Sequence, residues 1–157
     1  MKAVKLLWLL SFAGYLALAL LVYADIDSPV RIPAGDGQGA YELDKQSLFY
    51  YSLAGVVLVN AIVLVIANAT LYLPFPFKRK WRYDAESRKE FVKRSKEWVR
   101  GFGLLGNVAF ANLQMLVYGL NSPTTFPSQG IFYAVIVLAL VWLVAYVPLF
   151  KSPPQEL

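Results

Sequence analysis

Four long apolar runs, none of which contains a charged residue, constrain the fold of this chain most strongly. They cover about residues 6–24, 48–73, 102–120 and 131–150 of the 157. A helix needs roughly 20 apolar residues to cross the hydrocarbon core of a bilayer, so each run is long enough. Helices are also the form that satisfies every backbone hydrogen bond within one segment in lipid. The runs therefore predict an all-α fold, a four-helix bundle integral to a membrane, with a single domain over 1–157.

The charges between the runs predict which side of the membrane each loop occupies. Residues 78–100 carry ten Lys or Arg against four acids, whereas residues 25–45 carry five acids against two bases. Lys and Arg are enriched in cytoplasmic loops of membrane proteins. We therefore expect the basic loop 74–101 in the cytoplasm, the loop 25–47 outside, and both termini in the cytoplasm. The expected location is the cytoplasmic (inner) membrane, as a multi-pass protein.

The first run has a second interpretation, as a cleavable signal peptide. Lys2 and Lys5, an apolar stretch and the small residue of "VYA" before Asp25 fit that pattern. The run is longer than a typical signal core, and Trp8 and Tyr15 are bulky. A retained membrane span is the favoured interpretation. Aromatic residues near the ends of runs, Trp8 among them, are typical of headgroup depth.

The basic loop 74–101 contains a predicted amphipathic helix. Asp84 can cap a helix that reaches Arg100, and Glu90 and Arg94 stand four apart and can pair. Such a helix is expected to lie along the inner headgroups before the chain turns into the third run. Its basic and aromatic side chains would contact anionic lipid headgroups or a partner protein; they are Lys78, Arg79, Lys80, Trp81, Arg82, Lys93, Arg94 and Trp98. Nucleic acid is not expected, because acids alternate with the bases and the segment is held at the membrane.

Five carboxamide side chains lie within the predicted spans: Asn60, Asn68, Asn107, Asn112 and Gln114. Amides in lipid form hydrogen bonds between helices, and this is their expected role. The alternative is a small polar pocket or a chain of buried waters. The runs contain no Asp, Glu, Lys or Arg, which ion-coupled transporters and proton relays usually keep. Gly101, Gly103 and Gly106 predict either close helix packing or a bend at the start of the third span.

The chain contains neither histidine nor cysteine. Disulfides and thiolate chemistry are thereby excluded, and the usual general base and commonest transition-metal ligand are missing. The candidate carboxylates all lie in loops. We therefore expect a protein that is not an enzyme and that needs no cofactor or metal.

The outer loop 25–47 is polar and rich in turn-forming residues. Pro29 and Pro33 bracket an extended "VRI", glycines at 35, 37 and 39 permit tight turns, and Asp44 or Ser47 can cap the second span. The expected ligand- or partner-binding residues in this loop are Asp25, Asp27, Arg31, Asp36, Tyr41 and Lys45.

The order of these features resembles the SdpI-type family of small bacterial multi-span membrane proteins. Pro29, Ile32, Pro33, Gly37 or Gly39, and Lys45 match the outer-loop pattern of that family, and "LPFP" and a basic helix follow the second span as they do there. The resemblance covers about residues 5–120; the His-Phe-Asn element of the family loop is absent. It implies a binding, sensing or immunity-like protein whose outer loop meets a ligand and whose basic helix holds a partner.

The composition is equally compatible with a small accessory subunit of a larger membrane complex, or with a homo-oligomer. Four spans with few functional groups and many aromatic residues suit a subunit that links or stabilises others. A transporter is disfavoured by the small size of the chain. The sequence leaves the sensing module and the accessory subunit as the two open alternatives.

Overall fold

A computed structural model gives the fold over residues 2–33, 39–69, 85–122, 133–134 and 136–144. The chain forms helix α1 (Lys2–Asp25), strands β1 (Val30–Pro33) and β2 (Ala40–Leu43), and helices α2 (Lys45–Ala69) and α4 (Ala85–Asn121). Residues 133–134 and 136–144 are helical as well. The expected predominance of helix is thus observed, together with a two-stranded sheet that the all-α prediction did not contain.

Three helical segments are long and apolar enough to cross a membrane: Ala3–Asp25, Lys45–Ala69 and Lys89–Asn121. They contain the predicted runs 6–24 and 102–120 and most of 48–73, whose last four residues lie outside the described part of the chain. Of the fourth run, 131–150, only residues 133–134 and 136–144 are described. Large apolar side chains such as Leu21 and Val65 are exposed along these helices, as expected of surfaces that face lipid.

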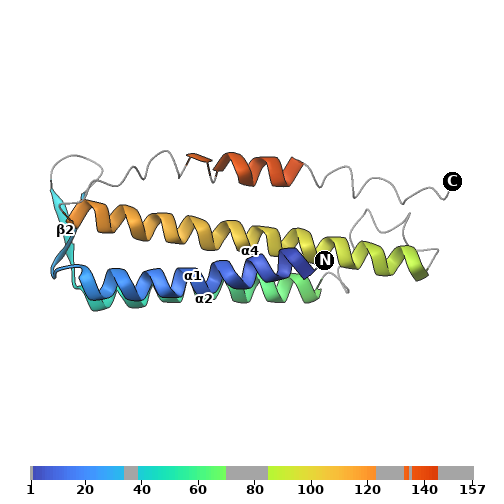
Figure 1. The fold of residues 1–157 in the computed structure, drawn as a ribbon, viewed down its shortest axis with the longest axis horizontal. Coiled ribbons are helices and arrows are strands. Elements are labelled where there is room, and N and C mark those ends of the chain that lie inside the picture. The colour runs from blue at the N-terminus through green and yellow to red at the C-terminus, as the bar shows by residue number, and fades with distance from the viewer. Residues whose placement is uncertain (1, 34–38, 70–84, 123–132, 135, 145–157) are drawn as a thin grey trace.

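Helices α1, α2 and α4 lie side by side, and the two strands lie across one end of the group (Figure 1). We call this end the hairpin end and the opposite one the basic end. Both α1 and α4 run toward the hairpin end, and α2 runs away from it. Both α1 and α2 contact α4 more extensively than they contact each other, so α4 is the central helix of the described fold.

Buried side chains fill the space between these helices at three successive levels. The level nearest the basic end is formed by Trp8, Val63, Ala67 and Val99. The middle level is formed by Tyr15, Ala19 and Val56, and the level at the hairpin end by Val22, Ile26 and Val30. In a membrane, where lipid is as apolar as these residues, close packing rather than transfer from water would hold the levels together.

Glycines let three neighbours approach α4 closely. A Cβ atom at Gly101 would lie 2.2 Å from the Trp142 ring, one at Gly103 2.6 Å from the Trp8 indole nitrogen, and one at Gly106 3.1 Å from Val59. The glycines therefore do not form one small face. They turn toward the C-terminal helical segment, α1 and α2 respectively, which explains why α4 can pack against all three.

The basic segment and the third span form one uninterrupted helix of 37 residues. The sequence predicted a separate interfacial helix that turns at the glycines, whereas α4 continues past the ends of α1 and α2 along its own axis (Figure 1). The physical reason is a buried stripe at a spacing of four, formed by Phe91, Ser95, Val99, Gly103 and Asn107. Each step of four residues turns the stripe by only about 40° round the helix, so the buried surface continues from the basic segment into the apolar run without a break.

The predicted outer loop 25–47 is a β-hairpin packed on helix ends. Strands β1 and β2 are antiparallel, with Val30 opposite Leu43 and Ile32 opposite Tyr41. Val30 is fully buried against Val22 and Ile26, which fixes the hairpin on α1. The extended form predicted for "VRI" is observed, whereas the partner strand "AYEL" was not predicted from the sequence.

Candidate functional site

The first polar feature is a chain of hydrogen bonds in the middle of the three helices. The Trp8 indole N–H donates to the Asn60 carboxamide oxygen at 2.7 Å, and the Asn60 amide donates to the Asn107 carboxamide oxygen at 2.6 Å. The second amide hydrogen of Asn60 reaches the Val56 carbonyl oxygen at 2.7 Å. Asn60 thus makes three hydrogen bonds and joins α1 to α4.

The Asn107 end of this series of hydrogen bonds is also satisfied within the protein. The Asn107 amide donates to the Ser11 hydroxyl at 3.0 Å and to the Trp8 carbonyl oxygen at 3.5 Å, and the Ser11 hydroxyl donates to the same carbonyl at 2.7 Å. Asn107 is fully buried. We call Trp8, Ser11, Asn60 and Asn107 the central network. An amide left unpaired in lipid is unfavourable, so the network fixes the rotation of three helices relative to one another.

The predicted interhelical amides fall into three groups. Asn60 and Asn107 are brought together in the central network. Asn112 and Gln114 are buried, and no hydrogen bond among the described residues involves either of them. Asn68 is exposed near the end of α2, which differs from the predicted interhelical position.

Trp8 was assigned by its sequence position to headgroup depth, but only 6% of it is exposed and its N–H is used inside the bundle. Ser11 was not identified at all. A signal existed in the sequence: Trp8 and Ser11 lie one turn apart on α1, and two polar groups at that spacing share a helix face.

The second polar feature holds the hairpin on α4. The Asn121 carboxamide accepts from the Arg31 backbone N–H at 2.7 Å and donates to the Arg31 carbonyl oxygen at 3.0 Å. The Tyr118 hydroxyl, one turn earlier on α4, donates to the Asp25 carboxylate at the end of α1. We call this pair of contacts the hairpin clamp. Neither Asn121 nor Tyr118 was identified from the sequence, because both lie at the end of an apolar run.

Asp44 connects the hairpin to α2. Its carboxylate accepts the Gln46 backbone N–H at 3.0 Å and the Ser28 hydroxyl at 3.1 Å. The first contact is an N-cap, and the helix begins at Lys45. Of the two caps that the sequence allowed, Asp44 is the one used.

The predicted ligand-binding residues share the hairpin end but do not converge. Asp25 is taken by the hairpin clamp, Asp27 is exposed, and Lys45 lies over the Tyr23 ring at 5.4 Å. Arg31 forms a surface ion pair with Glu42 at 3.3 Å, and 70% of Tyr41 is exposed. Asp36 lies outside the described residues. Within the described ranges, no three acidic side chains lie together as a metal site would require.

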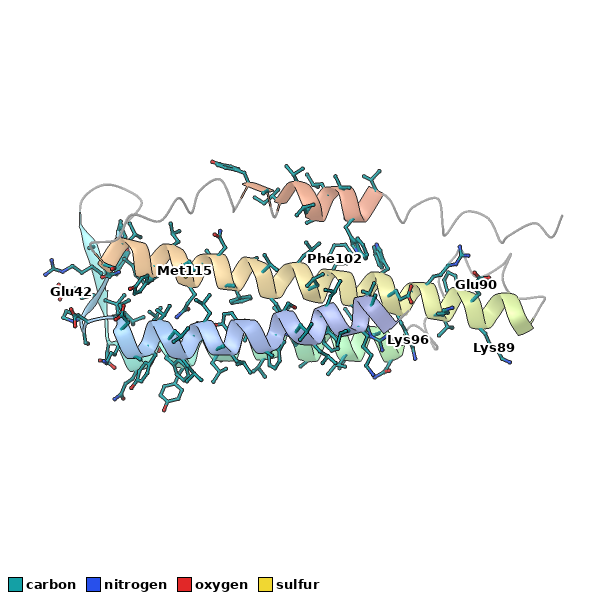
Figure 2. The ribbon with its side chains drawn as sticks, viewed as in Figure 1. Glu42, Lys89, Glu90, Lys96, Phe102 and Met115 are labelled. Atoms are coloured by element: carbon teal, nitrogen blue, oxygen red, sulfur yellow. The ribbon has the colours of Figure 1, made fainter. Side chains whose placement is uncertain are left out.

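The basic end is the third polar feature. Figure 2 shows Lys89 and Glu90 at the far end of α4 from Glu42 of the hairpin. Glu90 and Arg94 form the ion pair that their spacing predicted. Lys93 is exposed. The remaining basic and aromatic residues predicted to contact headgroups, Lys78, Arg79, Lys80, Trp81 and Arg82, lie outside the described part of the chain.

Trp98 belongs to an aromatic contact rather than to an isolated headgroup anchor. Its ring meets Phe102 edge to face at a centroid distance of 5.0 Å, and its carbonyl oxygen accepts the Trp142 indole N–H at 3.2 Å. The latter bond attaches the C-terminal helical segment to α4 beside Gly101, where the Trp142 ring has room.

Comparison of the chain with protein-family models, with curated proteins and with solved structures gives no match. The function is therefore inferred from three features of the chain itself. These are the central network in the middle, the hairpin clamp at one end, and the basic segment of α4 at the other.

Proposed function

We propose that the chain is a non-enzymatic integral membrane protein of a bacterial inner membrane that binds a ligand at its hairpin and couples this to a cytoplasmic partner through α4. A receptor of this kind needs a binding surface outside, a partner surface inside and a stiff connection between them. The resemblance of residues 5–120 to the SdpI-type family implies the same role. The absence of histidine and cysteine from the sequence supports binding rather than catalysis.

The observation that carries the proposal is the continuity of α4 from Ala85 to Asn121. At 1.5 Å per residue such a helix is about 55 Å long, well beyond the roughly 30 Å of the hydrocarbon core. One end holds the hairpin through Asn121 and the other carries Lys89 and Lys93. A displacement of the hairpin is thereby transmitted to the basic end without a flexible joint.

The orientation follows from the distribution of charge. With the basic end in the cytoplasm and the hairpin outside, the Lys- and Arg-rich segment obeys the positive-inside rule. Residues 133–134 and 136–144, with Trp142 against α4, would belong to a fourth span that completes the bundle and returns the C-terminus to the cytoplasm. The basic residues nearest the bilayer, Lys96 and Arg100, would then contact anionic lipid headgroups.

The hairpin offers side chains for a ligand that do not hold the fold together. Tyr41 is exposed, and the Arg31–Glu42 pair is solvated, with 71% and 56% of the two side chains exposed. Such a pair contributes little to stability. Both charged groups can therefore change partners on binding while Asn121 keeps the Arg31 backbone in place.

An accessory subunit of a larger membrane complex is the alternative. It is favoured by the apolar side chains exposed along α1 and α2, such as Leu21 and Val65, which a neighbouring membrane subunit could cover. A neighbouring subunit docked there would make the hairpin a structural cap rather than a binding surface.

Site-specific photo-cross-linking in native membranes separates the two functions. A photoreactive phenylalanine replaces Tyr41 on the hairpin, Lys93 at the basic end, or Leu58, whose side chain is 61% exposed on α2 and serves as the lipid-facing control. The sensing protein gives an adduct with an extracytoplasmic molecule at Tyr41 and with a cytoplasmic protein at Lys93. Stoichiometric adducts with large membrane subunits at Leu58 and Lys93, without one at Tyr41, would identify an accessory subunit and overturn the proposal.

A further inference from the structure

Tyr15 on α1 and Gln114 on α4 are buried polar side chains that, like Asn112, form no regular hydrogen bond with the described residues. Tyr15 is 1% exposed, and its hydroxyl makes no hydrogen bond of normal geometry, although the Ser52 side chain lies close to it. Gln114 is 4% exposed, and none of the hydrogen bonds of the described residues involves its carboxamide. In a membrane interior no solvent is at hand to satisfy such groups, so leaving them unpaired is strongly unfavourable.

The two side chains lie one heptad from the central network, toward the hairpin end. Tyr15 follows Trp8 by seven residues on α1, and Gln114 follows Asn107 by seven on α4. Seven residues make almost two helical turns and a rise of about 10 Å, so each pair lies on one face of its helix. Met115, beside Gln114, marks this level on α4 in Figure 2.

Contacts between the helices place Tyr15 and Gln114 at a common level. The Tyr15 ring meets Phe110, one turn before Gln114, edge to face at 6.2 Å. Helix α2 runs the opposite way, so the residue that corresponds to Asn60 at this level is Leu53, which packs against the cluster around Tyr15. The second level therefore repeats the first, with Tyr15, Leu53 and Gln114 in the places of Trp8, Asn60 and Asn107.

The difference between the levels is the group in the middle. In the central network, the Asn60 carboxamide accepts from Trp8 and donates to Asn107. Leu53 has no polar atom to do this for Tyr15 and Gln114. The Ser52 side chain lies beside the Tyr15 hydroxyl, but its own hydroxyl hydrogen is donated to the Phe49 carbonyl oxygen at 3.0 Å. Ser52 can still accept a hydrogen bond.

We propose that a water molecule occupies the second level and joins Tyr15 to Gln114 as Asn60 joins Trp8 to Asn107. Buried waters typically make about three hydrogen bonds to otherwise unsatisfied groups. The Tyr15 hydroxyl, the Gln114 carboxamide and the Ser52 oxygen supply that number. The occupant is neutral, because residues 6–24, 46–69 and 101–121 contain no charged side chain to pair with an ion. This water site does not depend on the function proposed above.

Radiolytic labelling in H₂¹⁸O tests the site in protein held in lipid nanodiscs. Hydroxyl radicals formed from a bound water add its oxygen to the nearest reactive side chain, even where that side chain is buried. We expect Tyr15 to acquire ¹⁸O. Trp8, which is also buried and reactive but is paired within the protein, stays near background and serves as the internal control. Labelling of Tyr15 no higher than that of Trp8 would overturn the proposal.

Two variants and a matched control test the hydrogen-bond partners of the water. Gln114→Leu removes one hydrogen bond to the water, and Tyr15 labelling falls by about fivefold, the factor that one net hydrogen bond contributes. Leu53→Asn supplies the missing amide and displaces the water, so labelling falls while the thermal midpoint is maintained. Leu53→Met, similar in volume and without a hydrogen-bonding amide, leaves labelling unchanged. If Gln114→Leu, which replaces the carboxamide by an apolar side chain, leaves Tyr15 labelling at the parent value, the proposed site is wrong.

Discussion

Asn121 holds the backbone of Arg31 by both of its polar groups, as acceptor at 2.7 Å and donor at 3.0 Å, and so fixes β1 to the end of α4. By accepting from the N–H and donating to the C=O of one residue, the carboxamide forms the hydrogen bonds that a neighbouring strand would form with β1. It satisfies the N–H and the C=O on the edge of β1 that faces away from β2. The Arg31 side chain takes no part in the clamp, which leaves it available at the surface.

The Asn121→Ala variant is expected to loosen the hairpin while the helices stay folded. Two hydrogen bonds to the Arg31 backbone are lost, for a cost of about 1–3 kcal/mol in local stability. Hydrogen exchange of the amides of β1 and β2 measures this directly. The matched control, Arg31→Ala, removes only a solvated ion pair and leaves exchange of the other strand amides unchanged. Equal exchange in the two variants would show that the clamp does not hold the hairpin.

Asn107→Leu breaks the central network and leaves an Asn60 amide hydrogen without a partner, while the Ser11 hydroxyl keeps its bond to the Trp8 carbonyl oxygen. The free energy of unfolding in detergent is expected to fall by about 1–3 kcal/mol. In the double variant Asn60→Leu/Asn107→Leu, the free energy of unfolding falls by less than the sum of the two single losses, because both partners of one hydrogen bond are removed together. Asn68→Leu, at the exposed position on α2, changes stability by less than about 0.5 kcal/mol. Strict additivity of Asn60 and Asn107 would contradict the network.

Gly103→Ala and Gly14→Ala form a matched pair at helical glycines. Alanine gains about 1 kcal/mol over glycine in a helix interior, and nothing lies within 4 Å of a Cβ atom at Gly14, so Gly14→Ala raises the midpoint of unfolding. At Gly103 the added atom lies 2.6 Å from the Trp8 indole nitrogen and 3.1 Å from Val63. Trp8 must then move off Asn60, and overpacking of this kind costs about 1–3 kcal/mol, so the midpoint falls. Shifts in the same direction would refute the close approach.

Cysteine accessibility tests the orientation of the fold, and the chain contains no native cysteine to interfere. In intact cells, a membrane-impermeant maleimide is expected to label Glu42→Cys on the hairpin and not Lys89→Cys at the basic end. Permeabilisation then exposes Lys89→Cys. Both positions are exposed in the folded chain, so differences in labelling report the membrane barrier. The reverse pattern would place the hairpin in the cytoplasm.

The helices could be predicted from sequence because the requirement that creates them is local. Each apolar run must satisfy its own backbone hydrogen bonds in lipid, whatever surrounds it. The ion pair Glu90–Arg94 and the cap at Asp44 were predictable for the same reason, since all the atoms involved lie within a turn of one another.

The central network could not be predicted in full, because it depends on how helices distant in the sequence are rotated. The sequence identified Asn60 and Asn107 as polar residues in apolar runs and proposed pairing between helices. It did not identify Trp8 as a partner, since an indole near the end of a run serves equally well at a headgroup. Only the packing of α1 against Gly103 turns Trp8 inward.

The continuity of α4 was within reach of the sequence but was overlooked. Phe91, Ser95, Val99 and Gly103 follow at a spacing of four, a pattern that crosses the proposed boundary at Gly101 unchanged. The change in composition there, from charged to apolar, instead predicts that a helix ends. Composition indicates whether the surroundings of a helix are polar or apolar, whereas periodicity indicates whether the helix continues.

The central position of α4 has a consequence for the order in which the protein assembles during synthesis. The ribosome delivers α1 and α2 to the bilayer first, and these two helices contact each other much less than either contacts α4. Until α4 emerges, Asn60 can bond to Trp8 but not to Asn107, and the hairpin lacks Asn121. The early chain is thus two loosely associated helices with an unattached hairpin, and the addition of α4 is the event that makes them one body.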